Sequence, residues 1–271
     1  MSIKASQPIG IFDSGVGGLT VAKSVKNLLP NEQLIYFGDL AHLPYGDKSE
    51  AAIQAYSIKI VDVLLQHNCK VILIACNSAS TASFDLVKEY VGKKAKVIDV
   101  INPVIDHLRE NYAGSKVGLI GTKQTVSSEV YLKKVEAQQS EIRLSSLATP
   151  LLVPLIEEGF KKKSVTQAII DEYLNSAELS NISALILGCT HYPLIKENVN
   201  VHYNGSVDII DSSEITALSL KAFLEYNNLL HKGIPIGKDK FMVSDYTEYF
   251  EHSTRLFFGE EVHLEKYVLW E

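Results

Sequence analysis

The sequence predicts an α/β protein made of two similar three-layer units with mostly parallel sheets, related by a pseudo-two-fold axis around a central cleft. Short apolar runs alternate with longer amphipathic stretches along the chain, which is the pattern of repeated βα units. Two pairs of segments echo one another at a spacing of about 110 residues. The 271 residues are also enough for two compact domains.

The elements follow in order along the chain, each justified by its pattern. Four- to six-residue apolar runs bounded by polar or glycine residues predict strands, at 9–13, 34–37, 71–75, 97–100, 117–120, 142–147, 184–187, 207–210, 240–243 and 262–264. Amphipathic stretches between them predict helices, among them 19–29, 49–67, 164–175 and 213–228.

The composition excludes several classes of protein. Hydrophobic residues make up 46% and charged residues 21%, so the chain has ample material for a core. A formal net charge of −6 lacks the footprint of a nucleic-acid binder. No apolar run has the length of a secretory signal or a membrane span, so we expect no membrane partner. Three cysteines without CxxC spacing suit a reducing compartment, and the expected location is the cytoplasm.

The internal echo predicts the domain organisation. IGIFDSG (9–15) resembles VGLIGTK (117–123), and KVILIACNS (70–78) resembles SALILGCTH (183–191). We expect a first domain of residues 1–100 plus 211–271 and a second of residues 101–210. The sequence leaves the oligomeric state open, and a homodimer is one state that it allows.

The first candidate site is the turn Asp13-Ser14-Gly15-Val16-Gly17-Gly18, which directly follows a predicted strand. Glycines there let backbone N–H groups converge on an anion at a helix N-terminus. The spacing matches neither the dinucleotide fingerprint nor a phosphate loop. A plain strand-to-helix turn is the alternative interpretation.

Two cysteines close the echoed strands, where ligands bind in open α/β sheets. Cys76 is followed by Asn77 and Ser78, and the N-terminus of the helix that begins there is expected to lower the thiol pKa. Cys189 is followed by Thr190 and His191. The alternative for each cysteine is a small buried hydrophobe.

Packing of the two units around a cleft would bring these two thiols face to face. A matched pair of thiols suits removal of a proton from one face of a carbon and its return to the other. Asp13 and His191 are the available proton-moving partners, one near each cysteine. Cys69 precedes its strand, at the opposite edge of the sheet, and is interpreted as structural.

The segments FDSGVGGLTV, ACNSAS and LGCTHYPL together resemble the glutamate racemase family. So do YFGDLAHLPYG, VGLIGTKQTVSSEVY and TPLLVPLIEEG, and the match extends to about residue 212. The resemblance implies interconversion of L- and D-glutamate for bacterial cell-wall precursor synthesis, with no cofactor and no metal. It departs at Ser78, where the family usually has Thr; the hydroxyl stays and a methyl is lost.

The resemblance also implies roles for single residues. Cys76 would deprotonate D-glutamate with Asp13 as its helper, and Cys189 would deprotonate L-glutamate with His191. The implied substrate contacts are Asp13, Ser14, Tyr45, Gly46, Asn77, Ser78, Thr190 and His191. Thr122 and Glu157 are weaker candidates for the rim of the site, and a solvated helix face is the alternative for Glu157.

Three other functions remain open at this point. A nucleophilic hydrolase or amide-transfer enzyme would use one Cys with His and Asp, which leaves the second cysteine without a role. A related decarboxylase or isomerase would keep the fold. A metal-binding protein would use Cys76, Cys189, His191 and Asp13 as tetrahedral ligands.

Overall fold

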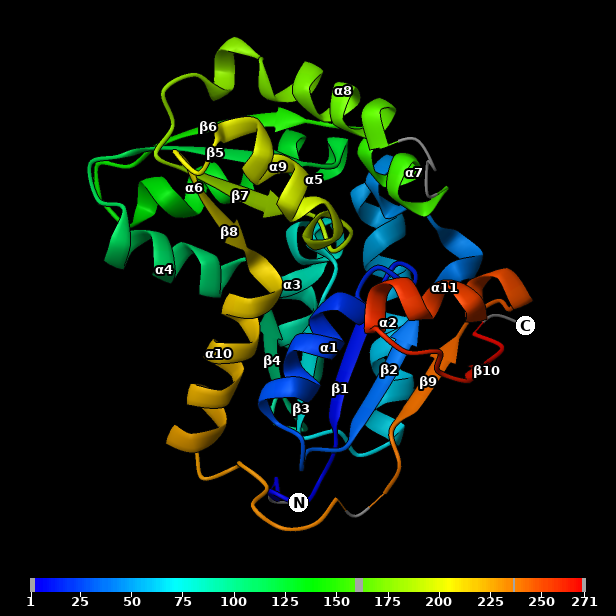
Figure 1. The fold of residues 1–271 in the computed structure, drawn as a ribbon. Helices are drawn as coiled ribbons and strands as arrows, with labels where there is room; N and C mark the ends of the chain where they lie inside the picture. Colours follow the sequence, from blue (N-terminus) through cyan, green and yellow to red (C-terminus); the bar gives the residue numbers. More distant parts are fainter. Residues whose placement is uncertain (1–2, 159–162, 236, 270–271) are drawn as a thin grey trace.

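The computed structural model describes residues 3–158, 163–235 and 237–269 (Figure 1). Two separate sheets form, and every strand pairing in them is parallel. The first sheet has the order β10-β9-β2-β1-β3-β4 and the second β6-β5-β7-β8. The order β2-β1-β3-β4 in the first sheet therefore repeats as β6-β5-β7-β8 in the second, which confirms the two similar α/β units predicted from the sequence.

The strands of the first sheet are β1 (Ile9–Asp13), β2 (Leu34–Gly38), β3 (Val71–Ile74), β4 (Lys96–Asp99), β9 (Lys240–Val243) and β10 (Leu264–Lys266). The strands of the second are β5 (Lys116–Gly121), β6 (Arg143–Ala148), β7 (Ala184–Gly188) and β8 (Asp208–Asp211). The α-helices are α1 (Leu19–Leu28), α2 (Glu50–Gln66), α3 (Asn77–Val91), α4 (Asn102–Asn111), α5 (Lys123–Ser127), α6 (Val130–Ala137), α7 (Leu152–Glu157), α8 (Lys163–Leu174), α9 (Lys196–Tyr203), α10 (Ser212–Tyr226) and α11 (Glu248–Phe258). Short 3₁₀ helices are η1 (Leu40–His42), η2 (Tyr45–Asp47), η3 (Ala177–Leu179) and η4 (Tyr192–Ile195).

Both faces of the central strands β1, β2 and β3 of the first sheet are buried, which explains why these strands are almost entirely apolar. In β2 the side chains of Leu34 and Tyr36 join the core shared with α1, whereas Ile35 and Phe37 join the core under α2 and α3. This alternation is what a strand covered on both faces requires. In the second unit, α8 lies above the sheet and α4 below it in the view of Figure 1.

The C-terminal segment completes the first sheet. α10 leaves β8 and packs along α1, and the chain then adds β9 and β10 beside β2 (Figure 1). Residues 262–264 were expected as the last strand, but pairing begins only at Leu264. The reason is that the backbone N–H of Val262 donates to Thr254 Oγ1 on α11, so Val262 is bound to the helix and does not pair with β9.

The sheets extend over residues 9–99 with 240–266, and over residues 116–211. The domain boundaries near residues 100 and 210 stay a prediction. Among the described ranges, no helix is long and apolar enough to span a bilayer.

Candidate active site

The strand orders place the candidate residues at equivalent points of the two sheets. All strands run parallel, but the order in which successive strands are added reverses between β1 and β3 in one sheet and between β5 and β7 in the other. Asp13 ends β1 and Cys76 follows β3, while Thr122 follows β5 and Cys189 follows β7. Ligands of open parallel sheets bind at the carboxyl ends of strands at such reversals. The two halves of the site thus lie at the same point of the repeated strand order, one in each sheet.

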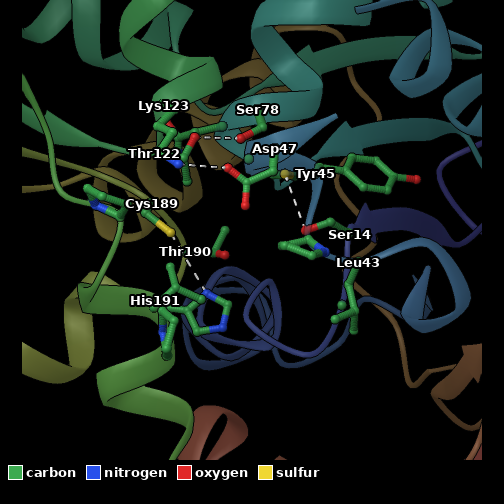
Figure 2. Close-up of a pocket in the computed structure, with 18 of the residues that line it drawn as sticks. Ser14, Leu43, Tyr45, Asp47, Ser78, Thr122, Lys123, Cys189, Thr190 and His191 are labelled. Atoms are coloured by element: carbon green, nitrogen blue, oxygen red, sulfur yellow. Dashed lines mark hydrogen bonds and ion pairs between the residues drawn. The ribbon is translucent and has the colours of Figure 1, made fainter. Parts of the chain in front are cut away.

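One cavity of ≈ 270 Å³ joins these points. Ligand pockets commonly measure about 300 to 1,000 Å³, so this one suits a small molecule. Eleven of the twelve residues singled out from the sequence line it: Ser14, Tyr45, Gly46, Cys76, Asn77, Ser78, Thr122, Glu157, Cys189, Thr190 and His191. Figure 2 shows side chains from both units turned toward this space. Asp13 is fully buried and does not line the cavity.

The Asp13 carboxylate organises the glycine turn. Its Oδ2 accepts backbone hydrogen bonds from Gly15 and Gly18, each at 3.0 Å. A Cβ on Gly18 would lie 2.4 Å from Asp13 Cβ, so only glycine fits there. The Gly15 amide, expected to bind an anionic ligand, is therefore already used by Asp13. Oδ1 is buried with no hydrogen-bond partner among the described residues.

Burial sets the protonation of this half of the site. Burial raises the pKa of Asp13, although the charge of His191 and the backbone hydrogen bonds work in the opposite direction. A carboxyl with a raised pKa holds or exchanges a proton more readily than an ordinary aspartate.

Cys76 lies at the N-cap of α3, where Sγ accepts a hydrogen bond from the backbone N–H of Ala79 at 3.4 Å. Ser14 Oγ is 3.6 Å from the same sulfur (Figure 2). The pKa of Cys76 is nevertheless raised to about 12, first by burial and then by the charge of Asp13. The N–H of Ala79 at the helix N-terminus does act to lower this pKa, as expected, but desolvation and the neighbouring carboxylate outweigh it.

Cys189 has a different environment. Its Sγ is 3.8 Å from Nδ1 of His191, and Nε2 of that ring is 2.8 Å from Glu157 Oε1. Burial acts to lower the pKa of His191, but the hydrogen bonds and charges of Cys189 and Glu157 raise it to about 10. The imidazole is thus held protonated between a sulfur and a carboxylate.

Glu157 therefore belongs to the site and not to a solvated helix face. It ends α7, lines the cavity and pairs with His191, although 38% of its side chain is exposed. Its partner is 34 residues away along the chain, so local sequence could not identify the contact.

Asn77 and Ser78 begin α3 on the floor of the cavity. Tyr131 donates from Oη to Asn77 Oδ1 at 2.7 Å, and Asn77 Nδ2 stays buried without a partner among the described residues. Ser78 Oγ is 2.9 Å from Thr122 Oγ1, which links the two units (Figure 2). Residues with an amide donor and two hydroxyls thus line the cavity, contributed by both units.

Tyr45 lines the cavity, but its hydroxyl already has a protein partner. Its side chain is buried, and Oη donates to Asp39 Oδ2 at 2.6 Å, so the hydroxyl is not available to a ligand. Gly46 lies so close to Thr122 that an added Cβ would be 2.9 Å from Thr122 Cβ. Glycine at this position lets the two units approach each other.

Several lining residues were not predicted. Asp47 and Lys123 form an ion pair of 3.5 Å at the exposed rim, one residue from each unit (Figure 2). Thr149, Pro150, Val153 and Pro154 form a further wall. The segment TPLLVPLIEEG contains that wall, but nothing in its residue types indicates a ligand contact.

A tetrahedral metal site was one of the open alternatives. Among the described residues, no group of three or more His, Cys, Asp or Glu side chains is placed to hold a metal ion. The geometry instead offers two separate thiols, each with its own ionisable partner.

Two repeated parallel α/β units bring two thiols to one small cavity, in a fold shared with racemases of known structure. The chain belongs to the Asp/Glu/hydantoin racemase family, whose profile matches residues 17–220. It is similar to the glutamate racemase of Chlorobaculum parvum, with 36% identity over 260 residues that cover 96% of this chain and 95% of that protein.

Solved structures agree with this assignment. Glutamate racemase from Francisella tularensis, in complex with D-glutamate, superposes with a TM-score of 0.90 at 37% identity and covers 98% of both chains. The Thermus thermophilus glutamate racemase, in complex with β-chloro-D-alanine, gives a TM-score of 0.87 at 37% identity, covering 97% of this chain and 98% of that chain.

Proposed function

We propose that the protein is a glutamate racemase, an isomerase that interconverts L- and D-glutamate by a two-base mechanism with Cys76 and Cys189. The observation that carries the proposal is the pair of thiols, one from each unit, that line a single small cavity. The relatives named above carry this activity in their names, and one was solved with D-glutamate. The D-glutamate produced would supply peptidoglycan precursor synthesis.

Recognition of glutamate rests on neutral polar groups that line the cavity, one of which has no other hydrogen-bond partner. Asn77 Nδ2 is the buried unpaired donor, held in that orientation by Tyr131. The hydroxyls of Ser78, Thr122 and Thr190 and the backbone near Gly46 supply further polar contacts. Among the lining residues that the structure describes, Lys123 is the one lysine or arginine, and it lies at the rim. These residues would thus bind two carboxylates mainly by neutral donors, with Lys123 as the cation at the entrance.

The protonation states suit attack on L-glutamate. At neutral pH the Cys76 thiol carries its proton, because its pKa is raised to about 12. The protonated His191 beside Cys189 stabilises a negative charge on that sulfur. Cys189 thiolate then removes the α-proton from one face, and the Cys76 thiol donates its proton to the other. Fixed donors around the substrate stabilise the carbanionic charge that develops between the two steps.

The reverse direction needs the opposite arrangement, with Cys76 as thiolate and Cys189 as thiol. Asp13 has a raised pKa and lies against the turn that carries Ser14, so it can accept the proton that Cys76 gives up. His191 can return a proton to Cys189 through Nδ1. Each thiol thus has a group next to it that resets its protonation.

The test is incubation of purified, reduced protein with L-glutamate in deuterated water, following optical rotation and the α-proton NMR signal. We expect racemisation with one deuterium per inverted molecule. Cys76→Ala and Cys189→Ala should each lose at least about 10²-fold in racemisation rate. The thiol that remains in each variant can still exchange an α-proton with solvent, but without inversion. Cys76→Ala would exchange the α-proton of L-glutamate, and Cys189→Ala would exchange the α-proton of D-glutamate.

Cys69→Ala is the matched control, since Cys69 is a third buried thiol outside the cavity. It should keep wild-type racemisation. Full activity in either pocket-cysteine variant would refute the two-thiol mechanism, and inactive wild-type protein would refute the glutamate assignment.

We also propose that the first domain comprises residues 1–100 with 211–271 and the second residues 101–210, which is supported by the ends of β4 and β8 at Asp99 and Asp211. Three free cysteines support a cytoplasmic location. A homodimer remains a prediction.

A further inference from the structure

The C-terminal helix α11 touches both members of the His191–Glu157 pair. Phe257, which is 1% exposed, packs against the His191 ring with centroids 5.0 Å apart and planes at 79°. Eight residues earlier on the same helix, Tyr249 donates from Oη to the backbone carbonyl of Glu157 at 2.9 Å. No sequence motif marks α11, and the family profile ends at residue 220, before this helix begins.

The His191 ring is confined on its other sides as well. A Cβ on Gly17 would lie 2.4 Å from Cε1 of His191, so the glycine turn of the first unit closes against the ring. Glu157 binds Nε2. With Phe257 in place, the ring keeps Nδ1 directed at Cys189 Sγ, 3.8 Å away. These three neighbours lie on separate segments, Gly17 in the turn after β1, Glu157 on α7 and Phe257 on α11, and the turn and α11 belong to the unit of the first sheet.

α11 is itself fixed at both ends, so it can serve as a support. Thr247 Oγ1 accepts from the Phe250 N–H at its start, and Gly259 ends it with φ +97°. Near its end, Thr254 Oγ1 accepts from Val262 N–H, which ties the helix to the chain entering β10. The helix also packs on α1, the helix that follows the Asp13 turn.

We propose that α11 is a positioning element for the acid–base machinery of Cys189. Phe257 sets the orientation of the His191 ring, and Tyr249 sets the position of Glu157. The inference rests on the proposed racemase function. It gives the C-terminal segment a role in one half-reaction, beyond completing the first sheet.

The test compares Phe257→Leu with Phe258→Leu. Phe258 is the matched control because it is the next aromatic on α11 but packs on Phe241, at 5.2 Å, and not on His191. An aromatic contact of this kind is worth about 0.5 to 1.5 kcal/mol, so Phe257→Leu should lower kcat/KM about two- to tenfold. Phe258→Leu should leave kcat/KM within about twofold of wild type.

Substrate isotope effects distinguish positioning from general loosening of the fold. Phe257→Leu should raise the isotope effect with α-deuterated L-glutamate and lower it with α-deuterated D-glutamate. We expect shifts in the same two directions for His191→Asn, which removes the ring itself. In a second pair, Tyr249→Phe is the test and Tyr226→Phe the control. Tyr249→Phe should shift the two isotope effects in the same directions as Phe257→Leu but by less, because Tyr249 is largely exposed, as is Tyr226. Equal isotope-effect changes for both enantiomers, or no difference between Phe257→Leu and Phe258→Leu, would overturn the inference.

A substrate-free readout separates this inference from the proposed function. Iodoacetamide labelling followed by mass spectrometry gives the rate at Cys189 relative to Cys76. We expect this ratio to fall about two- to tenfold in Phe257→Leu, and not in Phe258→Leu, because a displaced His191 stabilises the Cys189 thiolate less. If wild-type protein failed to racemise glutamate but this ratio still fell, the positioning role would stand and the assigned reaction would not. An unchanged ratio counts against α11 as a positioning element.

Discussion

The two thiol-bearing halves of the cavity occupy equivalent places in the fold but differ in chemistry. Cys76 caps a long helix and lies near a fully buried aspartate, whereas Cys189 precedes only a short 3₁₀ helix and pairs with a histidine. The repeated strand order fixes where the sulfurs lie, whereas burial and the ionisable side chains packed around each sulfur differ between the two halves. The repeated unit thus supplies the geometry, and the neighbouring side chains supply the difference between an acid and a base.

The strongest test of this difference between the two halves replaces the ionisable partner of each thiol in turn by an amide. Asp13→Asn and His191→Asn should each lower kcat/KM about 10²-fold. Asp13→Asn slows the Cys76 step, so it should raise the isotope effect with α-deuterated D-glutamate and lower it with L-glutamate. His191→Asn should do the reverse. Stopped-assay polarimetry with both deuterated enantiomers measures this, and parallel shifts in the two variants would contradict the assignment of partners.

The two halves should also differ in how pH affects stability. The folded protein holds the His191 proton more tightly than the unfolded chain does, since the pKa rises from 6.5 to about 10. The unfolded state therefore binds fewer protons in this window, and the free energy of unfolding contributed by His191 is full below pH 6.5 and is lost as pH rises toward 10. For Cys76 the corresponding window runs from 9.0 to about 12.

Urea unfolding at pH 6, 7.5 and 9 isolates the histidine contribution. Wild type should lose on the order of 2 kcal/mol across this range, less than the full shift implies because Glu157 is partly exposed. His191→Asn should show a flatter profile, while Cys76→Ala should follow wild type below pH 9. A Cys76→Ala profile as flat as that of His191→Asn would show that the two halves are not independent.

The smallest expected effect concerns the residue that departs from the usual family pattern. Ser78→Thr adds one methyl beside the bridge to Thr122 and keeps the hydroxyl. Burial of one methyl is worth about 0.8 kcal/mol, so KM for both enantiomers should change at most about fourfold, with kcat unchanged. Initial-rate kinetics in both directions measures it. A large loss of kcat would mean that the bridge, and with it the approach of the two units, had been disturbed.

Sequence reasoning identified the parts of the site that depend on short-range order. Cys76 and Cys189 could be predicted because each closes an apolar run, and the echo between the runs showed that they are equivalent. The buried position of Tyr45 Oη, the pairing of Glu157 with His191 and the contact of Phe257 with the same ring could not be predicted, because each depends on packing between distant elements. The start of β10 was misplaced for a related reason, since a side chain on α11 captured the N–H of Val262.

The ion pair between Asp47 and Lys123 bridges the rim of the cavity, and its stability sets how often the rim is bridged. Both side chains are 62% exposed, and exposed pairs are worth about 0.2 to 1 kcal/mol. In population terms, the bridged form then exceeds the unbridged form only about 1.4- to 5-fold. The rim therefore spends a substantial fraction of its time unbridged, and glutamate can enter and leave without waiting for a rare opening event.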